Sequence, residues 1–166
     1  NVNLDYAYVI AAYHDLGLCE GRELHHIVSG KILEADRQLQ QWFSKDEIKL
    51  MKEAVEDHRA SAKNSPRTIY GKIIAEADRD IIPLKIIKRT IQYSIANSPS
   101  NDKEHHWANL LNHMAEKYAE GGYMKLWFEN SKNAERLREL RKIISDTAQL
   151  RDIFEEFYDN EIVNVK

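Results

Sequence analysis

The sequence predicts an all-α protein, and three observations support this prediction. Apolar residues recur at the three- and four-residue spacing of helices through most of the chain. Glycine and proline, with 6 and 3 occurrences, are sparse for an all-β protein with many tight turns. Ser44 and Glu47 form the S-x-x-E capping-box pattern that marks the start of a helix. We therefore expect a helical bundle with a helical extension at its C-terminal end.

Each expected helix shows one apolar stripe. Ser65 and Pro66 look like an N-cap followed by proline at the first helical position, and Pro83 is expected to open the next helix. The last stripe is taken as one long helix. In chain order the stripes are Tyr6, Val9, Ile10 and Tyr13; Leu24, Ile27, Val28 and Ile32; Ile48, Met51 and Val55; Ile69, Ile73 and Ala77; Ile86, Ile87 and Ile91; Trp107, Leu110, Leu111, Met114 and Tyr118; and Leu137, Leu140, Ile144 and Ala148.

A polar break over residues 97–102, which includes Pro99, suggests how the chain is organised. We expect a helical core over residues 1–97 and a C-terminal helical extension over residues 98–166 that packs on it. The extension alone is short for an independent core. Trp42, Trp107 and Trp127 stand among apolar neighbours and are interpreted as core residues.

Composition restricts the functional classes. The chain of 166 residues suits one domain, and its formal charge of −3 gives no bulk attraction for nucleic acid. A single cysteine, Cys19, fits a reducing compartment. No apolar run approaches the roughly 20 residues that span a membrane, and no signal-peptide pattern stands at the start. We therefore expect a cytoplasmic protein without a membrane partner.

His14 and Asp15 stand together at the expected end of the first helix. From their spacing alone, a histidine favoured by the helix dipole beside a turn-forming aspartate is as good an interpretation as a metal-binding pair. His25 and His26 open the next helix. The interpretation of the pair depends on what the other helices contribute.

Two further helices bring similar side chains. His58 is expected on the helix of Met51 and Val55, on their buried side. Asp78 ends an otherwise apolar helix, where a buried carboxylate would need a cation beside it. Imidazole with carboxylate suits Mn, Fe, Co, Ni or Zn and is unlike an all-thiolate site. Four successive helices therefore favour a divalent metal site. His105, His106 and His113 are interpreted as surface or partner-facing residues.

Several strings in the first 90 residues resemble HD-domain phosphohydrolases in order and spacing. They are Ala-Tyr-His-Asp-Leu-Gly at residues 12–17, His25 with Ser29-Gly30, Glu-Asp-His-Arg at residues 56–59, and Gly-Lys-Ile-Ile-Ala-Glu-Ala-Asp-Arg at residues 71–79. The resemblance implies an HD-type helical bundle in which His14, Asp15 and Asp78 hold a divalent ion (Mn, Mg, Fe, Co, Ni or Zn). Members with two ions would use His25 or His26, together with His58. The family's first histidine ligand is expected upstream of Asn1, on a helix that this chain lacks.

The resemblance also implies a metal-dependent phosphohydrolase that acts on a small phosphomonoester or nucleotide. Catalytic roles are expected for Asp15, His58 and Arg59. Phosphate-binding roles are expected for the cationic residues Lys63, Arg67 and Arg79. The alternatives are an HD-fold ligand-binding or regulatory module without turnover, and a helical scaffold whose histidines are incidental. A homo-oligomer is compatible with each interpretation.

Overall fold

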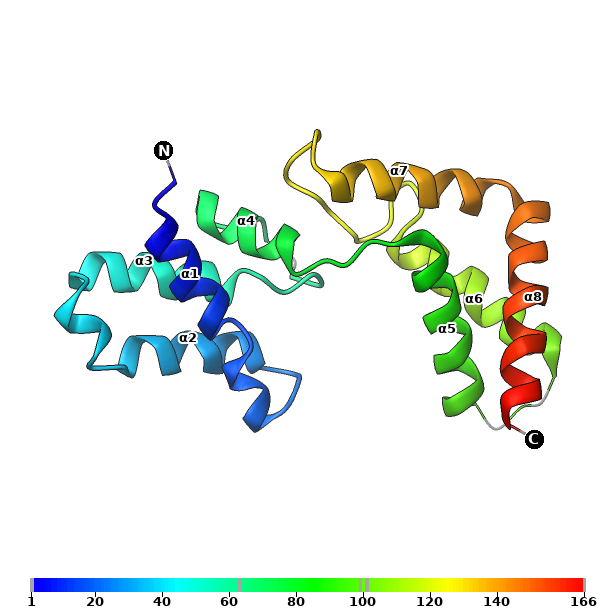
Figure 1. Ribbon diagram of the computed structural model, residues 1–166, viewed down its shortest axis with the longest axis horizontal. Coiled ribbons are helices and arrows are strands. Elements are labelled where there is room, and N and C mark those ends of the chain that lie inside the picture. Colours follow the sequence, from blue (N-terminus) through cyan, green and yellow to red (C-terminus); the bar gives the residue numbers. More distant parts are fainter. Residues whose placement is uncertain (1, 63, 99, 101, 166) are drawn as a thin grey trace. The chain divides into compact units, whose positions relative to one another are not determined.

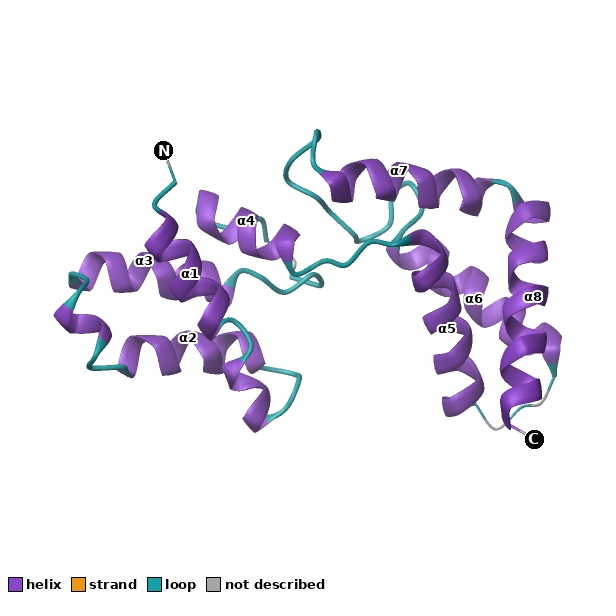
Figure 2. Ribbon diagram, viewed as in Figure 1, coloured by secondary structure: helices purple, strands orange, loops and turns teal. Residues whose placement is uncertain are grey.

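The computed structural model describes residues 2–62, 64–98, 100 and 102–165. In these ranges it contains eight α-helices, two short 3-10 helices and no strand (Figure 2). The prediction of an all-α fold is therefore confirmed. The chain divides into two compact units, Asn1–Arg79 and Asp80–Lys166, and each is described here by itself.

The first unit is a small helical bundle that contains all the predicted metal ligands. Helix α2 packs against α3 and η1, while α1 packs against α3, α4 and α2. Figure 1 labels its four α-helices. Its elements are α1 (Leu4–Tyr13), η1 (Leu16–Glu20), α2 (His25–Ala35), η2 (Leu39–Gln41), α3 (Lys45–Glu56) and α4 (Ile69–Ala77). Its core consists of Ile10, Leu33, Ile48, Met51, Ala54, Val55, Tyr70 and Ile74.

Local side-chain caps fix where the helices of this unit begin. The capping box of Ser44 and Glu47 starts α3, as the sequence predicts. The Thr68 side chain accepts a hydrogen bond from the Gly71 backbone at 3.0 Å and caps α4. The prediction that Ser65 and Pro66 begin this helix is therefore wrong, because both residues lie in the preceding loop.

The second unit consists of α5 (Pro83–Asn97), α6 (Lys103–Lys117), α7 (Lys132–Ser145) and α8 (Thr147–Val165). Pro83 stands in the first turn of α5, as expected. Helix α5 packs against α6, α8 and α7. The division between the compact units therefore falls at residue 79, whereas the sequence suggests one at residue 97. The packing of an extension on the core stays a prediction.

Two other expectations about structure are wrong. The final helical stretch is two helices, because the Asp146 backbone is extended and its side chain caps α8 through the Gln149 amide. Trp42 is 79% exposed beside η2 and does not belong to the core. Trp107 and Trp127 are half-buried.

Candidate metal centre

The ends of α1 and α4 bring three predicted ligands together. His14 is the C-cap of α1, Asp15 follows it, and Asp78 is the C-cap of α4. His14 Nε2 lies 3.6 Å from Asp15 Oδ2 and 3.5 Å from Asp78 Oδ1. Donor atoms that share an ion at roughly 2.0–2.2 Å lie about 3.0–3.6 Å from one another. The three side chains thus have the separations that one ion requires.

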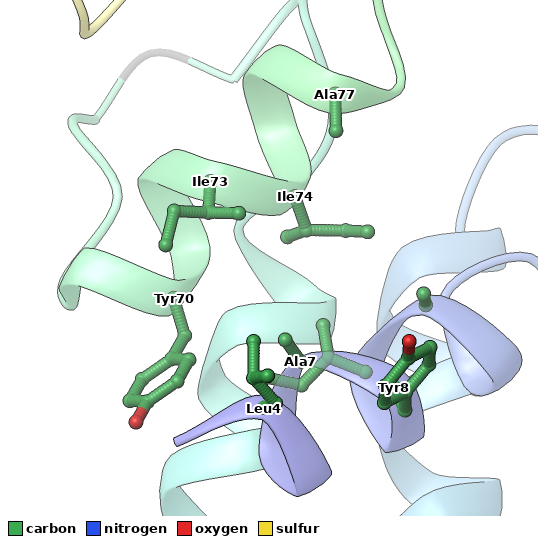
Figure 3. A pocket seen from close by; sticks show the side chains of 9 residues that line it. Leu4, Ala7, Tyr8, Tyr70, Ile73, Ile74 and Ala77 are labelled. Atoms are coloured by element: carbon green, nitrogen blue, oxygen red, sulfur yellow. The ribbon is translucent and has the colours of Figure 1, made fainter. Parts of the chain in front are cut away.

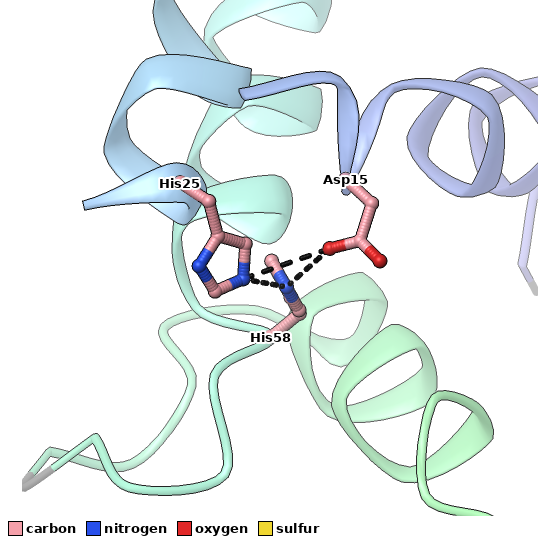
Figure 4. Close-up of side chains that lie close together, drawn as sticks. All are labelled: Asp15, His25 and His58. Atoms are coloured by element: carbon pink, nitrogen blue, oxygen red, sulfur yellow. Dashed lines mark hydrogen bonds and ion pairs between the residues drawn. The ribbon is translucent and has the colours of Figure 1, made fainter. Parts of the chain in front are cut away.

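A second group of donors shares Asp15 with the first. Asp15 Oδ1 lies 3.6 Å from His25 Nε2 and 3.6 Å from His58 Nε2, and the two imidazole nitrogens are 3.1 Å apart (Figure 4). One carboxylate oxygen of Asp15 therefore faces His14, and the other faces His25 and His58. This arrangement suits a carboxylate that bridges two ions.

Backbone hydrogen bonds orient the three imidazoles alike. The Nδ1 atoms of His14, His25 and His58 lie 2.8, 2.8 and 2.6 Å from the carbonyl oxygens three residues earlier, those of Ala11, Arg22 and Val55. A carbonyl oxygen only accepts, so each Nδ1 donates its proton and each Nε2 carries a lone pair toward the cluster. Metal-binding histidines typically have this pattern. The donor set therefore fits a divalent ion at both groups.

Burial distinguishes the ligands. His58 is 2% exposed, and burial lowers the pKa of its imidazole below the ordinary value, although the Val55 carbonyl and Asp78 act in the opposite direction. The side chains of Asp15 and Asp78 are 45% and 42% exposed. The expectation that Asp78 is buried is wrong, because it stands at the open end of α4. The cluster therefore combines an imidazole of the interior with carboxylates that are exposed to solvent.

His58 does not lie on the helix of Met51 and Val55, as the sequence suggests. Helix α3 ends at Glu56, and His58 follows its C-cap Asp57. The His58 ring still reaches the interior because its Nδ1 bonds back to the Val55 carbonyl. The expected burial of His58 is thus correct, and its expected position on a helix is wrong.

The neighbouring His26 is not in either donor group. It opens α2 beside His25, with ring centroids 5.5 Å apart. Its Nδ1 is buried and has no hydrogen-bond partner among the described residues. Burial, and then the positive charge of Arg59, lower the pKa of its imidazole. The structure thus selects His25 as the cluster member of this pair.

The predicted phosphate-binding cations have different surroundings. The Arg59 guanidinium donates to the backbone carbonyl of Glu23. Arg67 forms ion pairs with Glu56 at 2.8 Å and Asp57 at 3.0 Å, and it donates to the Glu53 carbonyl. These bonds tie the loop before α4 to the end of α3. The predicted role of Arg67 in binding phosphate therefore competes with a visible structural role.

Arg79 and Lys63 complete the predicted cations. Arg79 is buried, with 8% of its surface exposed, and its guanidinium donates to the Ala75 carbonyl of α4. Burial lowers the pKa of this guanidinium, and Asp78 and Glu76 raise it. The Arg79 guanidinium therefore lies in the interior, and its role in binding phosphate stays a prediction. Lys63 lies outside the described residues.

Sequence reasoning missed two residues that position the cluster. The Gly17 amide donates to the buried Ser29 hydroxyl at 2.8 Å and so joins η1 to α2. A Cβ atom on Gly17 would stand 2.2 Å from the His25 carbonyl oxygen. This close approach of two backbones sets the distance between Asp15 and His25. In the sequence, the signals of this contact are Gly17, two residues after Asp15, and Ser29, and both lie in the strings that resemble the HD family.

The histidines of the second unit form no such group in the described part of the chain. His106 is 1% exposed, and its ring nitrogens lie 2.8 Å from the Ser94 hydroxyl and 2.9 Å from the Ser100 carbonyl. The expectation of a surface position is therefore wrong for His106. His105 is exposed and His113 is half-buried.

Comparison with known families identifies the family to which the fold belongs. Residues 1–80 match the family model described as HD domain, and the chain is an HD-domain superfamily protein. HD domains bind divalent metals. Membership of this family implies, in general terms, a metal-dependent phosphohydrolase. No curated protein and no solved structure matches the chain. Among the residues that the structure describes, no helix is long and apolar enough to cross a membrane.

Proposed function

We propose that the chain is a metal-dependent phosphohydrolase that acts on a small phosphomonoester or nucleotide, with its chemistry at the cluster around Asp15. One observation carries the proposal: the two oxygens of Asp15 face two separate donor groups, each with the separations of metal ligands. Incidental surface histidines would not present three Nε2 lone pairs to one carboxylate. His14, Asp15 and Asp78 would hold one divalent ion, and Asp15, His25 and His58 a second.

A divalent ion supplies Lewis acidity toward a phosphoryl oxygen when it is bound there. The protein's own groups then have separate tasks. The exposed carboxylate of Asp78 orients an attacking water and accepts its proton, because it stands at the solvent side of the cluster. Asp15 would contribute one carboxylate oxygen to each ion, while backbone carbonyls hold the rings of His14, His25 and His58 in place. His58 keeps a neutral imidazole in the interior because burial lowers its pKa.

Cations near the cluster offset the negative charge that develops on the phosphoryl group. Arg59 follows His58 directly and is half-buried, and we assign it this role. Arg79, buried beside Asp78, contributes positive charge without offering an exposed guanidinium. Lys63 remains a proposed phosphate ligand. Arg67 is the weakest of these assignments because Glu56 and Asp57 already engage it.

A phosphatase screen tests the proposal. The purified chain is freed of metal, loaded in turn with Mn²⁺, Co²⁺, Ni²⁺ and Mg²⁺, and assayed for phosphate release from nucleoside monophosphates, sugar phosphates and aryl phosphates. We expect turnover that a chelator removes and added metal restores. Asp15→Asn should abolish this activity, and His105→Asn, at an exposed histidine of the second unit, should leave it unchanged. Metal binding without turnover on any substrate would instead favour an HD-fold ligand-binding module.

A further inference from the structure

Each compact unit contains a pocket, and the two pockets differ in charge. The groove between α1 and α4 of the first unit is apolar, and none of the described residues that line it is charged (Figure 3). The second unit has a pocket of about 530 Å³ between α7 and the segment that joins α6 to α7, which is yellow in Figure 1. Its lining includes three cationic residues, Lys125, Arg138 and Arg141, and one acidic residue, Glu129. The pocket of the second unit therefore has the charged walls that an ionic ligand requires.

The spacing of residues along α7 explains the cationic wall. Ala134, Leu137, Arg138 and Arg141 all line the pocket, and they stand three or four residues apart, so they share one face of the helix. Ala134 and Leu137 are buried, whereas Arg138 is exposed and Arg141 is half-buried. The same face of α7 thus supplies core contacts at its start and two guanidinium groups further along.

Backbone carbonyls hold both guanidinium groups in place. Arg138 Nη1 donates to the Glu129 carbonyl at 3.2 Å, and Arg141 Nε donates to the Tyr118 carbonyl at 3.0 Å. A guanidinium carries several N–H donors, so each arginine can donate to a ligand while it keeps this bond. The two side chains are therefore oriented before a ligand binds, which reduces the entropy that binding costs.

The positive charge of the pocket is only partly neutralised. Arg141 pairs with Glu120 at 3.1 Å, but the Glu120 side chain is 84% exposed, so solvent weakens this ion pair. Even with Glu120 counted beside Glu129, the three cations are in excess. The chain as a whole has a formal charge of −3, so the pocket reverses the sign of the molecule locally. Such a concentration of positive charge attracts anions.

The other walls favour an anion that carries a flat ring. Trp127 and Phe128 line the pocket and are half-buried, and Leu126 and Leu137 add apolar surface. Aromatic side chains bind nucleobases by stacking, and an arginine binds a phosphate through a pair of parallel N–H bonds. The volume of about 530 Å³ is within the range of roughly 300–1,000 Å³ that is usual for small-molecule sites. A phosphate ester with an aromatic base matches both kinds of wall.

We propose that this pocket binds a mononucleotide, with the phosphate at Arg138 and Arg141 and the base beside Trp127 and Phe128. The inference goes beyond the proposed function, because it requires neither a metal ion nor the donor groups around Asp15. It gives the chain a second ligand site, which is formed by residues of the second unit alone.

The test measures the binding of adenosine monophosphate to the metal-free chain by calorimetry. Ribose 5-phosphate, adenosine and inorganic phosphate serve as partial ligands. We expect adenosine monophosphate to bind at one site per chain. Ribose 5-phosphate keeps the phosphate and lacks the base, so it should bind roughly 5- to 150-fold more weakly, which is the range for the loss of one stacked base.

Four variants locate the binding site. Arg138→Gln should weaken the binding of adenosine monophosphate by about tenfold, the effect of one lost hydrogen bond to a charged group. Lys125→Gln, in the segment before α7, is the second pocket variant and should weaken binding in the same direction. Lys142→Gln is the matched control, since Lys142 is an exposed cation of the same helix that does not line the pocket. Asp15→Asn alters the metal centre and should bind the nucleotide as the parent chain does.

The outcomes separate this inference from the proposed function. Binding that Arg138→Gln weakens, and that Asp15→Asn and Lys142→Gln leave unchanged, supports the pocket even if no metal gives turnover and the proposed function fails. Binding that Asp15→Asn weakens and both pocket variants leave unchanged places the nucleotide at the metal centre and overturns the inference. Equal affinities for adenosine monophosphate and inorganic phosphate also overturn it, because the base then contributes nothing. The absence of binding in the parent chain overturns it as well and leaves any phosphatase activity standing.

Discussion

The Nε2 atoms of His25 and His58 face each other at 3.1 Å, although the Nδ1 atoms of both rings are already bonded to backbone carbonyls. In the neutral rings both Nε2 atoms carry lone pairs, and two lone pairs at this distance repel each other. A metal ion bound between them would relieve the repulsion. Asp15 Oδ1, 3.6 Å from each nitrogen, adds negative charge at the same place. The local structure is therefore arranged around positive charge.

Replacement of His14 tests the first donor group. Its Nε2 lies within ion-pair distance of both Asp15 Oδ2 and Asp78 Oδ1, at 3.6 and 3.5 Å. We expect His14→Ala to abolish metal binding at this group and phosphatase activity together. Elemental analysis and a phosphate-release assay on the same sample measure both. A variant that loses activity and keeps full metal content would show that His14 is not a ligand.

Replacement of His58 separates ligation from acid–base chemistry. If His58 holds a second ion, His58→Ala should reduce the bound metal from two ions to one per chain. If it only moves a proton or positions phosphate, turnover should fall by about 10²–10⁴-fold while metal content stays constant. Paired metal analysis and kinetics decide between the two roles. Unchanged metal content and unchanged turnover would make His58 a packed core residue and refute both.

The sequence predicts much of this site because its signals are local. The capping box at Ser44 and the helix ends at His14 and Asp78 follow from spacing along single helices. The sequence alone does not show that His25, and not His26, belongs to the cluster. Adjacent residues on a helix point about 100° apart, and only the packing of the helices decides which one faces Asp15.

Tertiary contacts explain what sequence reasoning got wrong. Arg67 looks like a free cation in the sequence, yet the fold brings it to Asp57 and Glu56, ten and eleven residues away. Nothing in the sequence around Arg79 indicates that its side chain is buried, with 8% of its surface exposed. Trp42 looks like a core residue because it is large and apolar, but no element of the first unit covers it. These outcomes depend on which helices and loops pack against one another, and the spacing of apolar residues along the chain does not show this.

The low pKa of His58 predicts how stability depends on pH in the metal-free chain. Below about pH 6.5, the ordinary value for histidine, the unfolded chain takes up a proton at His58 that the folded chain accepts only at lower pH. The unfolded state then binds more protons than the folded state. The free energy of unfolding should therefore decrease as the pH decreases below about 6.5, by up to about 1.4 kcal/mol per pH unit. Urea titrations between pH 5 and pH 8 (a range of roughly 1.5 units on either side of 6.5) measure this slope.

The comparison variants isolate the contribution of His58. His58→Gln should reduce the slope below about pH 6.5, because glutamine does not titrate, while His26 and His113, whose pKa values burial also lowers, keep part of it. Val55→Ala should lower stability by a similar amount at every pH, since it removes buried apolar contacts without removing a proton site. An equal slope in the parent chain and in His58→Gln would mean that other groups cause the acid sensitivity.

Arg67 should matter for stability more than for turnover. Its guanidinium joins Asp57, Glu56 and the Glu53 carbonyl, but its side chain is 46% exposed, so solvent weakens the ion pairs. We expect Arg67→Ala to lower the free energy of unfolding by about 0.5–1 kcal/mol. Its kcat/KM should stay within a few-fold of the parent value. A large loss of kcat/KM with unchanged stability would restore the role in phosphate binding.

A substitution at Gly17 should change both the packing of η1 on α2 and the position of Asp15 in the metal centre. A Cβ atom there would stand 2.2 Å from the His25 carbonyl oxygen and 2.6 Å from the Ser29 amide nitrogen. Both are backbone atoms of α2 and cannot rotate away, so Gly17→Ala must push η1 from α2. Overpacking of this kind costs about 1–3 kcal/mol of stability. The same displacement moves Asp15 away from His25, and the second donor group should therefore lose its ion before the first does.

Metal titration by calorimetry, together with urea unfolding, measures both effects of Gly17→Ala. Cys19→Ala is the control, because Cys19 is exposed on the same 3-10 helix and should change neither stability nor metal content. His14 and Asp78 stand at the ends of α1 and α4, and Asp15 directly follows His14, so this donor group should keep its ion in the variant. Loss of both ions in a folded protein would show that the two donor groups form a single site, and retention of both would show that η1 does not set the position of Asp15.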